Sequence, residues 1–245
     1  MHLIVFLLAS VFIRGTLTED DALIIIDVQN CFTEGGTLPV DDGEQVIPVI
    51  NDVRRLFSVV VLSQDWHCVN HVSFASQYPE YNVGDVVNLE YDPSGQLCRT
   101  ADVNLSYTVE CSGDTEILNQ HLWPDHCVIN TSDADFRREL ITTDTDIIIQ
   151  KGYHCQLDSY SVFYDNGRYS ETHLEQTLLD YEVRNVYLTG LATDYCVYWS
   201  AKDAKQLGFE TYVILDGTRG INPKTIADAI QDMKSKGTRN GIKGY

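Results

Sequence analysis

Short apolar runs of strand length alternate along the chain with segments whose apolar residues recur at helical spacing. The runs lie at 22–26, 58–62, 146–150, 185–190 and 211–215. Helical spacing occurs between or after them, at 44–57, 170–182, 194–207 and 223–235. Runs that are apolar throughout are typical of strands buried on both faces of a parallel sheet. The alternation predicts an α/β fold with three layers, α/β/α, around a central, mostly parallel sheet.

One segment interrupts this alternation. A chain of 245 residues with 44% hydrophobic content can bury one sizeable core, so we expect a single domain over 19–245. The segment 84–122 is polar, with a DPSG turn and no helical stripe. Because long structureless loops are uncommon in compact domains, we expect a hairpin-like insertion stapled by Cys98 and Cys111. The basic segment 236–245 has no apolar stripe and is expected to be a flexible tail.

The charge balance limits the class of partner. The chain carries 17 basic and 36 acidic residues, a formal net charge of −19. Such acidity argues against nucleic acid or an anionic membrane as a partner. A small neutral or cationic molecule fits better. The oligomeric state stays open, with a homo-oligomer allowed.

The N-terminal residues resemble a targeting signal. The run MHLIVFLLASVFIRG is apolar and too short to span a membrane comfortably. We expect residues 1–18 to be a signal peptide and the mature chain to be secreted. Asn104 and Asn130 each begin an N-x-[ST] triplet, an acceptor for a glycan in a eukaryotic secretory pathway.

The cysteine count agrees with export. Seven cysteines leave six to form disulfides if one is kept free for chemistry. Cys31 and Cys68 both follow expected neighbouring strands, so we expect them to meet, which leaves Cys127 with Cys155. This pairing is one choice among many connectivities.

Residues able to do chemistry follow several of the expected strands. In open α/β sheets, ligands bind beyond the carboxyl ends of the strands. Asp27 follows the first run, Lys151 follows the third, and the LATDYC segment leads to Cys196. Thr193 or Asp194 can cap the helix that begins there, and the opening turn of a helix favours a cysteine thiolate.

Asp27, Lys151 and Cys196 complement one another at one sheet edge. The carboxylate can take the thiol proton, the ammonium can hold carboxylate and thiolate ionised, and the sulfur is the nucleophile. An ordinary Asp–Lys ion pair is the alternative interpretation, but it accounts for Asp27 and Lys151 only and does not explain Cys196. We therefore predict a nucleophilic triad.

A second polar group, DWHCVNH, follows the run 58–62. Asp65 and His67 flank one residue, so on an extended segment their side chains leave the same side and can share a cation. The third ligand is His71 or His126. Carboxylate and imidazole ligands together suit Zn²⁺, Fe²⁺ or Mn²⁺. An Asp-x-His pair by itself is more often an ordinary surface feature.

Five motifs stand in one order along the chain. They are DVQNCF (27–32), DWHCVNHVSF (65–74), WPDHCV (123–128), KGYHC…YSVF (151–163) and GLATDYCV (190–197). Over about 22–220 the chain thus resembles the nicotinamidases, metal-dependent members of the isochorismatase-like cysteine hydrolases. The resemblance implies a catalytic triad and a metal site, Zn²⁺ foremost. The triad residues are Asp27, Lys151 and Cys196, and the metal ligands are Asp65, His67 and His126, with His71 a ligand in some members only.

The resemblance also implies further details of the site. The Leu191–Ala192 peptide bond would be cis, and the N–H groups of Ala192 and Cys196 would form an oxyanion hole. Aromatic pocket positions match or adjoin Phe32, Trp123, Tyr160 and Tyr195.

The activity implied by the resemblance is hydrolysis of nicotinamide to nicotinate and ammonia through a cysteine thioester. One alternative is a metal-free relative that hydrolyses another small substrate, such as isochorismate. Another is a secreted, inactive binding protein on the same scaffold. Most relatives are intracellular and lack a leader, so secretion rests on residues 1–18, the glycosylation triplets and the cysteine count.

Overall fold

The computed structural model describes residues 17–241. Residues 1–16 of the expected signal peptide and 242–245 of the expected tail lie outside the described residues. In the part of the chain that is described, no helix is long and apolar enough to cross a membrane.

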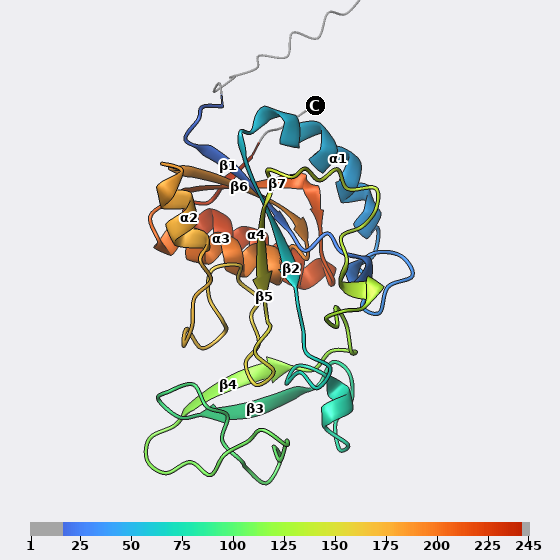
Figure 1. Ribbon diagram of the computed structural model, residues 1–245, viewed down its shortest axis with the longest axis vertical. Coiled ribbons are helices and arrows are strands. Elements are labelled where there is room, and N and C mark those ends of the chain that lie inside the picture. Colours follow the sequence, from blue (N-terminus) through green and yellow to red (C-terminus); the bar gives the residue numbers. More distant parts are fainter. Residues whose placement is uncertain (1–16, 242–245) are drawn as a thin grey trace, which may run out of the picture.

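Six strands form one sheet in the order β5-β2-β1-β6-β7-β8 (Figure 1). Their bounds are β1 (Asp21–Ile26), β2 (Val59–Asp65), β5 (Ile147–Lys151), β6 (Asn185–Leu191), β7 (Glu210–Arg219) and β8 (Arg239–Asn240). Every neighbouring pair is parallel. The carboxyl ends of these strands therefore share one edge, which is where the candidate site lies.

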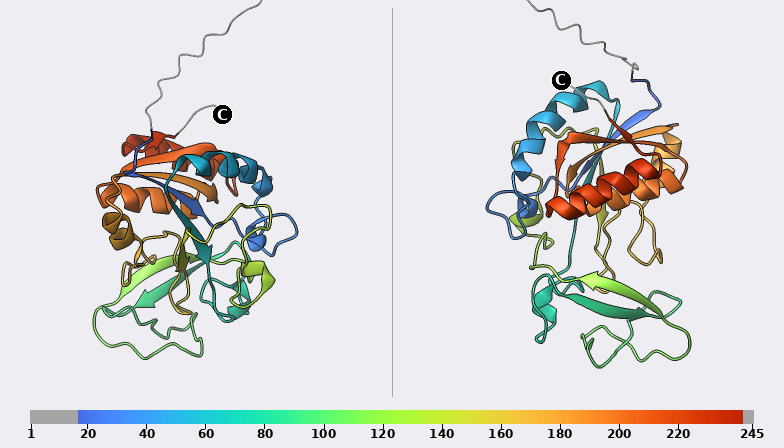
Figure 2. Two further views of the ribbon diagram at one scale, coloured as in Figure 1. Left: turned by 45° about the horizontal axis from the view of Figure 1, so that its top comes forward. Right: turned by 180° about the vertical axis from the view of Figure 1, so that it is seen from behind.

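Helices cover both faces of this sheet (Figure 2). They are α1 (Val46–Val53) on one face, and α2 (Leu174–Asp180), α3 (Cys196–Gln206) and α4 (Pro223–Ser235) on the other. Strand β1 shows why: Ala22, Ile24 and Ile26 pack toward α2, α3 and α4, whereas Leu23 and Ile25 pack toward α1. Alternate residues of a strand point to opposite faces, so an apolar run must be covered twice. The predicted three-layer architecture is confirmed.

Within residues 17–241, five short 3-10 helices lie in the connections. They are η1 (Asn30–Phe32), η2 (Gly43–Gln45), η3 (Arg54–Leu56), η4 (Ala75–Gln77) and η5 (Ser132–Ala134). The helix expected at 44–57 is thus split, with α1 as its central α-helical part.

The insertion forms a separate layer beyond the strand ends (Figure 1). Strands β3 (Val86–Tyr91) and β4 (Glu116–His121) pair antiparallel. Their inner side chains, with Leu97 and Leu122, bury a small core of their own. Cys98 and Cys111 are bonded, with Cα atoms 5.4 Å apart. The predicted stapled insertion is confirmed.

The other two disulfides differ from the expectation. Cys31 bonds to Cys127 and Cys68 bonds to Cys155, so the expected Cys31–Cys68 and Cys127–Cys155 pairs are wrong. Strand β2 lies between β1 and β5, and the chain after β2 turns toward the β5 side. There Val72 N–H donates to the Cys155 carbonyl at 2.7 Å. The sequence does not indicate whether the loop after β2 turns toward β1 or toward β5.

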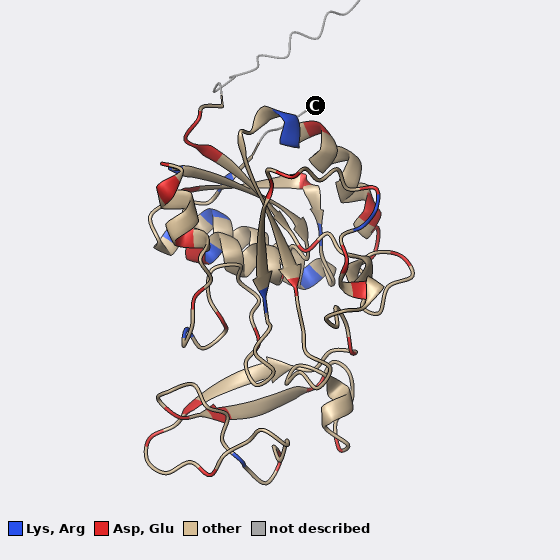
Figure 3. Ribbon diagram, in the orientation of Figure 1, with Lys and Arg blue, Asp and Glu red and all other residues tan. Residues whose placement is uncertain are grey.

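The expected flexible tail needs a partial correction. Arg239–Asn240 forms β8, which pairs with β7, and Gly241 N–H donates to the Val213 carbonyl. The short β8 pairing escaped the sequence because two polar residues carry no apolar pattern. Acidic residues are spread over the whole molecule, whereas Lys and Arg are fewer (Figure 3). Helices α3 and α4 carry two lysines each, and η3 carries Arg54 and Arg55.

Candidate active site

The structure brings Asp27, Lys151 and Cys196 together from three different strands. Asp27 directly follows β1, Lys151 ends β5, and Cys196 opens α3 after β6. The Lys151 Nζ atom lies 3.0 Å from Asp27 Oδ2 and 3.4 Å from Cys196 Sγ. All three side chains are buried. Their polar atoms therefore interact in a site that excludes bulk water, where charge interactions are strong.

Ser63 on the neighbouring strand β2 fixes the orientation of Asp27. Its hydroxyl donates to Asp27 Oδ1 at 2.6 Å and accepts from Asp27 N–H at 3.1 Å. The other carboxylate oxygen, Oδ2, is left toward Lys151. Sequence reasoning missed Ser63, because a serine within an apolar strand carries no signal of its partner.

Burial controls the protonation of the triad. It raises the pKa of Asp27, and the Lys151 ammonium offsets only part of that effect. Burial also raises the pKa of the Cys196 thiol well above its ordinary value. Burial would lower the pKa of Lys151, but Asp27 and Asp65 raise it well above its usual range. Burial therefore opposes the thiolate form that the helix end was expected to favour, and Lys151 offsets part of the effect of burial on the pKa of Cys196.

Asp65, His67 and His126 form a second group beside the triad. Each offers one ligand atom, and these atoms lie within 4.8 Å of one another. Asp65 Oδ2 is 3.4 Å from His67 Nε2 and 3.7 Å from His126 Nε2. The three side chains come from β2, the chain just after β2, and the loop after β4. They converge although His126 lies 59 positions after His67 in the chain.

The hydrogen bonds of both histidines suit a metal ion. His67 Nδ1 lies 2.8 Å from the Gly152 carbonyl, and His126 Nδ1 lies 2.7 Å from the Pro124 carbonyl. Because a carbonyl only accepts, each Nδ1 donates a proton, and in a neutral imidazole of this tautomer the lone pair lies on Nε2. Burial alone would raise the pKa of Asp65, but Lys151 and His67 hold it well below its usual range. One carboxylate and two imidazole lone pairs thus fit a divalent cation.

Asp65 joins the two groups. Its Oδ1 atom accepts from Lys151 Nζ at 2.6 Å, while Oδ2 faces the histidines. Gln29 holds its backbone: the Gln29 amide donates to the Asp65 carbonyl at 2.9 Å and accepts from the Asp65 N–H at 2.8 Å. Gln29 stands in the DVQNCF motif, yet nothing in that string identified this contact.

Gly152 is another residue that sequence reasoning passed over. Its φ is +66°, and a Cβ there would approach His67 Cε1 to 2.5 Å. A side chain would therefore displace the imidazole that the Gly152 carbonyl orients. The only available signal was its position directly after Lys151.

His71 lies outside the group formed by Asp65, His67 and His126. Its ring stacks on His67 with centroids 3.9 Å apart. Its Nδ1 pairs with Ser73 Oγ at 2.8 Å, and its ring nitrogens group with His67 and Asp158. His126 is thus the third member of the Asp65 group, and His71 backs the His67 ring.

The four predicted aromatic residues surround the site. Trp123 and Tyr195 meet edge to face with centroids 4.9 Å apart, and Tyr160 lies 5.5 Å from Tyr195. Phe32 packs 5.6 Å from the His126 ring. Phe74, which sequence reasoning did not single out, contacts the rings of both His67 and His126.

The turn before α3 carries the expected backbone features. The Leu191–Ala192 bond is cis. The N–H groups of Tyr195 and Val197 donate to the Ala192 carbonyl, whereas those of Ala192 and Cys196 make no backbone hydrogen bond in residues 17–241. Two donors beside the sulfur are therefore free to hold a developing oxyanion.

The expected cap of α3 is wrong. The N-cap position is Tyr195, with no side-chain cap. The Asp194 carboxylate instead accepts from the N–H groups of Ile221 and Asn222, and Thr193 N–H donates to the Arg219 carbonyl. Asp194 is drawn to the chain before α4, a tertiary contact that local sequence does not show.

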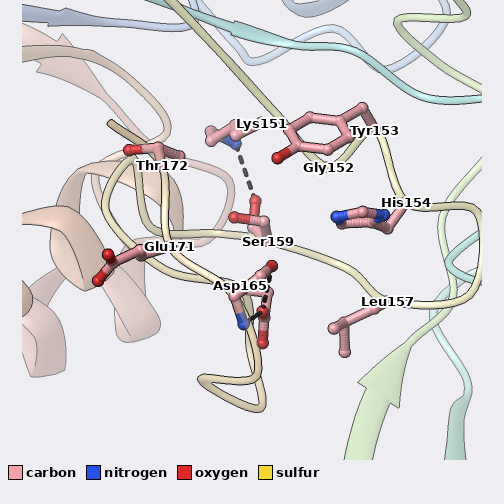
Figure 4. A pocket seen from close by; sticks show the side chains of 10 residues that line it. Lys151, Gly152, Tyr153, His154, Leu157, Ser159, Asp165, Glu171 and Thr172 are labelled. Atoms are coloured by element: carbon pink, nitrogen blue, oxygen red, sulfur yellow. Dashed lines mark hydrogen bonds between the residues drawn. The ribbon is translucent and has the colours of Figure 1, made fainter. Parts of the chain in front are cut away.

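The chain between Lys151 and Thr172 lines a small pocket next to Lys151 (Figure 4). The Ser159 carbonyl accepts from Lys151 Nζ at 3.0 Å. The pocket that this segment lines has a volume of about 20 Å³, room for roughly one water. The Lys151 ammonium contacts Asp27, Asp65, Cys196 and the Ser159 carbonyl.

Known proteins are similar to this chain over most of its length. The Isochorismatase domain family matches residues 21–240. The chain belongs to this family. The nicotinamidase of Acinetobacter baylyi is 37% identical over 228 residues, with 93% of this chain and 94% of that one covered.

Two solved structures of family members are similar over most of the chain. One is the pyrazinamidase of Pyrococcus horikoshii in complex with zinc, with TM-score 0.67, 30% identity, and coverage of 90% of this chain and 98% of that one. The other is the yeast nicotinamidase bound to the inhibitor nicotinaldehyde, with TM-score 0.77, 28% identity and the same two coverages.

Proposed function

We propose that this chain hydrolyses nicotinamide to nicotinate and ammonia, with Cys196 as nucleophile. The observation that carries the proposal is the convergence of Asp27, Lys151 and Cys196 within hydrogen-bond reach, directly beside Asp65, His67 and His126. The family members matched above bear the names nicotinamidase and pyrazinamidase, which supports a small aromatic amide as substrate.

Acylation uses the triad. Asp27 accepts the Cys196 proton, and the sulfur forms a bond to the amide carbon. The N–H groups of Ala192 and Cys196 stabilise the oxyanion. When the tetrahedral intermediate collapses, its C–N bond breaks and Asp27 returns the proton to the nitrogen, so ammonia leaves and a thioester remains.

Deacylation reverses these roles with water. Asp27 takes a proton from the attacking water, the C–S bond breaks, and the sulfur is reprotonated. Lys151 stays protonated throughout, because Asp27 and Asp65 hold its pKa well above the usual range despite burial. Its fixed charge stabilises the thiolate as the Cys196 proton leaves.

Asp65, His67 and His126 would hold the metal, Zn²⁺ foremost and Fe²⁺ or Mn²⁺ as alternatives. Such an ion would supply a Lewis-acidic site for the pyridine nitrogen and so seat the carboxamide at Cys196. The aromatic side chains of Phe32, Trp123, Tyr160 and Tyr195 supply the walls that contact the ring.

Ammonia release from nicotinamide and from benzamide, with metal-loaded and chelator-stripped protein, tests this proposal. We expect nicotinamide turnover to fall on the order of 10²-fold when the metal is removed and to return with Zn²⁺, Mn²⁺ or Fe²⁺. Benzamide lacks the ring nitrogen, so its slow turnover should change little. Unchanged nicotinamide turnover in the stripped protein would remove the metal from the proposal. No ammonia from any amide would favour an inactive binding protein.

We also propose that the chain matures in the secretory pathway. Three disulfides in the described residues suit an oxidising compartment. Asn104 and Asn130 are both exposed, so both glycosylation triplets are open to modification. Recovery of the glycosylated chain from culture medium of expressing animal cells tests this, and a chain found only inside the cells would refute it.

A further inference from the structure

Two of the three disulfides adjoin the metal-ligand histidines. Cys68 directly follows His67 and bonds to Cys155, which lies four residues after Lys151 (155 − 151). The Cα atoms of Cys68 and Cys155 are 5.6 Å apart, and the bond closes 87 residues of chain. This disulfide therefore ties the loop after β2 to the loop after β5.

The second disulfide does the same for the other histidine. Cys127 directly follows His126 and bonds to Cys31, which lies four residues after Asp27 (31 − 27). Both cysteines are fully buried, with Cα atoms 5.4 Å apart across 96 residues of chain. The loop that carries His126 is thus fastened to the loop after β1.

The two histidines differ in what else holds them. His67 lies two residues beyond Asp65, which is paired with Lys151 in the parallel sheet. The loop of His126 follows β4 of the insertion and lies outside the six-stranded sheet. Its backbone pairs with the chain after β2. His67 N–H donates to the Cys127 carbonyl at 3.1 Å, Ile129 N–H donates to the His67 carbonyl at 2.9 Å, and Trp123 N–H donates to the Ser73 carbonyl at 2.8 Å. These partners lie on the loop after β2 and not on a strand of the sheet, so we expect His126 to depend on its disulfide more than His67 does.

We propose that Cys31–Cys127 and Cys68–Cys155 are positioning elements of the metal site. They hold the backbones of His126 and His67 so that both Nε2 atoms face Asp65 before a cation binds. Ligands that are fixed in advance lose less conformational freedom on binding, so cation affinity depends on the intact disulfides. The inference rests on the metal site of the proposed function. It implies that full cation affinity requires an oxidising environment, in which the two disulfides form.

Cation affinity of disulfide variants tests this inference. The full chain, purified with its disulfides intact, is titrated with Zn²⁺ in competition with a chromophoric chelator. The variants are Cys31→Ser/Cys127→Ser and Cys68→Ser/Cys155→Ser, with Cys98→Ser/Cys111→Ser as the matched control. Circular dichroism selects a temperature at which each variant is folded.

We expect Cys31→Ser/Cys127→Ser to weaken Zn²⁺ binding about tenfold or more, the effect typical of losing support around a metal ligand. Cys68→Ser/Cys155→Ser should weaken binding less, and the control should stay within about twofold of wild type. If Cys31→Ser/Cys127→Ser does not fold, the Cys68→Ser/Cys155→Ser variant decides. The inference would be overturned if Cys31→Ser/Cys127→Ser and Cys68→Ser/Cys155→Ser both bind Zn²⁺ within twofold of the wild-type affinity. It would also be overturned if the control variant loses as much Zn²⁺ affinity as they do.

The proposed function fails in a different way. A wild-type chain that binds no Zn²⁺ would refute the metal site itself. A wild-type chain that binds Zn²⁺ and releases ammonia, with variants that bind Zn²⁺ equally well, would refute the positioning inference alone.

Discussion

The triad and the metal-ligand group lie side by side, yet they are held in place by different means. Asp27, Lys151 and Cys196 follow or end strands of one parallel sheet, whose hydrogen-bond ladder fixes their spacing. His67 and His126 lie on loops and depend on carbonyl hydrogen bonds and adjacent disulfides. The sheet thus positions the groups that we propose to react, together with Asp65, whereas disulfides flank the two histidines that would complete the metal site.

Replacing Asp27 tests the triad at the strand ends, and we expect it to have the largest effect on kcat among the next three tests. Asp27→Asn keeps the size of the side chain but removes the base, so kcat for nicotinamide should fall about 10³-fold, within the range for a lost general base. Zn²⁺ content should stay at the wild-type level, because the ligands are on other elements. A fall in kcat of less than tenfold would contradict the role of Asp27 as the base. A loss of bound Zn²⁺ as well would show that the triad and the metal-ligand group are not separable.

Ser63 sharpens the comparison within the triad. Its hydroxyl donates to the ionised Asp27, which lowers the pKa of that carboxyl and opposes the effect of burial. Asp27 must be ionised to accept the thiol proton, so kcat/KM falls as the pH falls through its pKa. In Ser63→Ala that pKa rises further, and the acid limb of the kcat/KM profile should move to higher pH.

We expect Ser63→Ala to lower kcat roughly tenfold at neutral pH, because one hydrogen bond to a charged group is lost. A merely structural role would lower the melting temperature and leave the acid limb in place. Ser63→Thr, which keeps the hydroxyl, should restore the wild-type position of the limb.

The insertion gives the smallest expected effect on activity. Its disulfide, Cys98–Cys111, joins cysteines 13 positions apart in the part of the chain between β3 and β4, outside the six-stranded sheet. Cys98→Ser/Cys111→Ser should therefore leave kcat within about twofold of wild type. It should lower the free energy of unfolding by on the order of 3 kcal/mol in the chain-entropy model. Denaturant unfolding with a parallel ammonia assay checks both, and a tenfold loss of activity would place the insertion in the site.

Periodicity and strand order were enough to predict the sheet and the triad. Apolar runs located β1, β2, β5, β6 and β7, and the carboxyl-end rule predicted that Asp27, Lys151 and Cys196 would meet. The resemblance added His126 to Asp65 and His67, a choice that spacing alone left open between His71 and His126.

The features that the sequence could not show depend on tertiary contacts. The path of the loop after β2 decided that Cys68 meets Cys155, and no local pattern encodes that path. Asp194 binds the chain before α4 in place of capping α3. Burial also raises the pKa of the Cys196 thiol more than Lys151 lowers it, an effect of tertiary packing that the sequence did not show.

The central claim is that the Cys196 sulfur attacks the amide carbon. Ammonia release from nicotinamide, measured for wild type and for Cys196→Ala at equal concentration and equal Zn²⁺ content, tests it most directly. We predict that wild type releases ammonia and that Cys196→Ala loses on the order of 10³-fold or more in kcat, because the nucleophile is gone. Ammonia release by Cys196→Ala at the wild-type rate would contradict the claim.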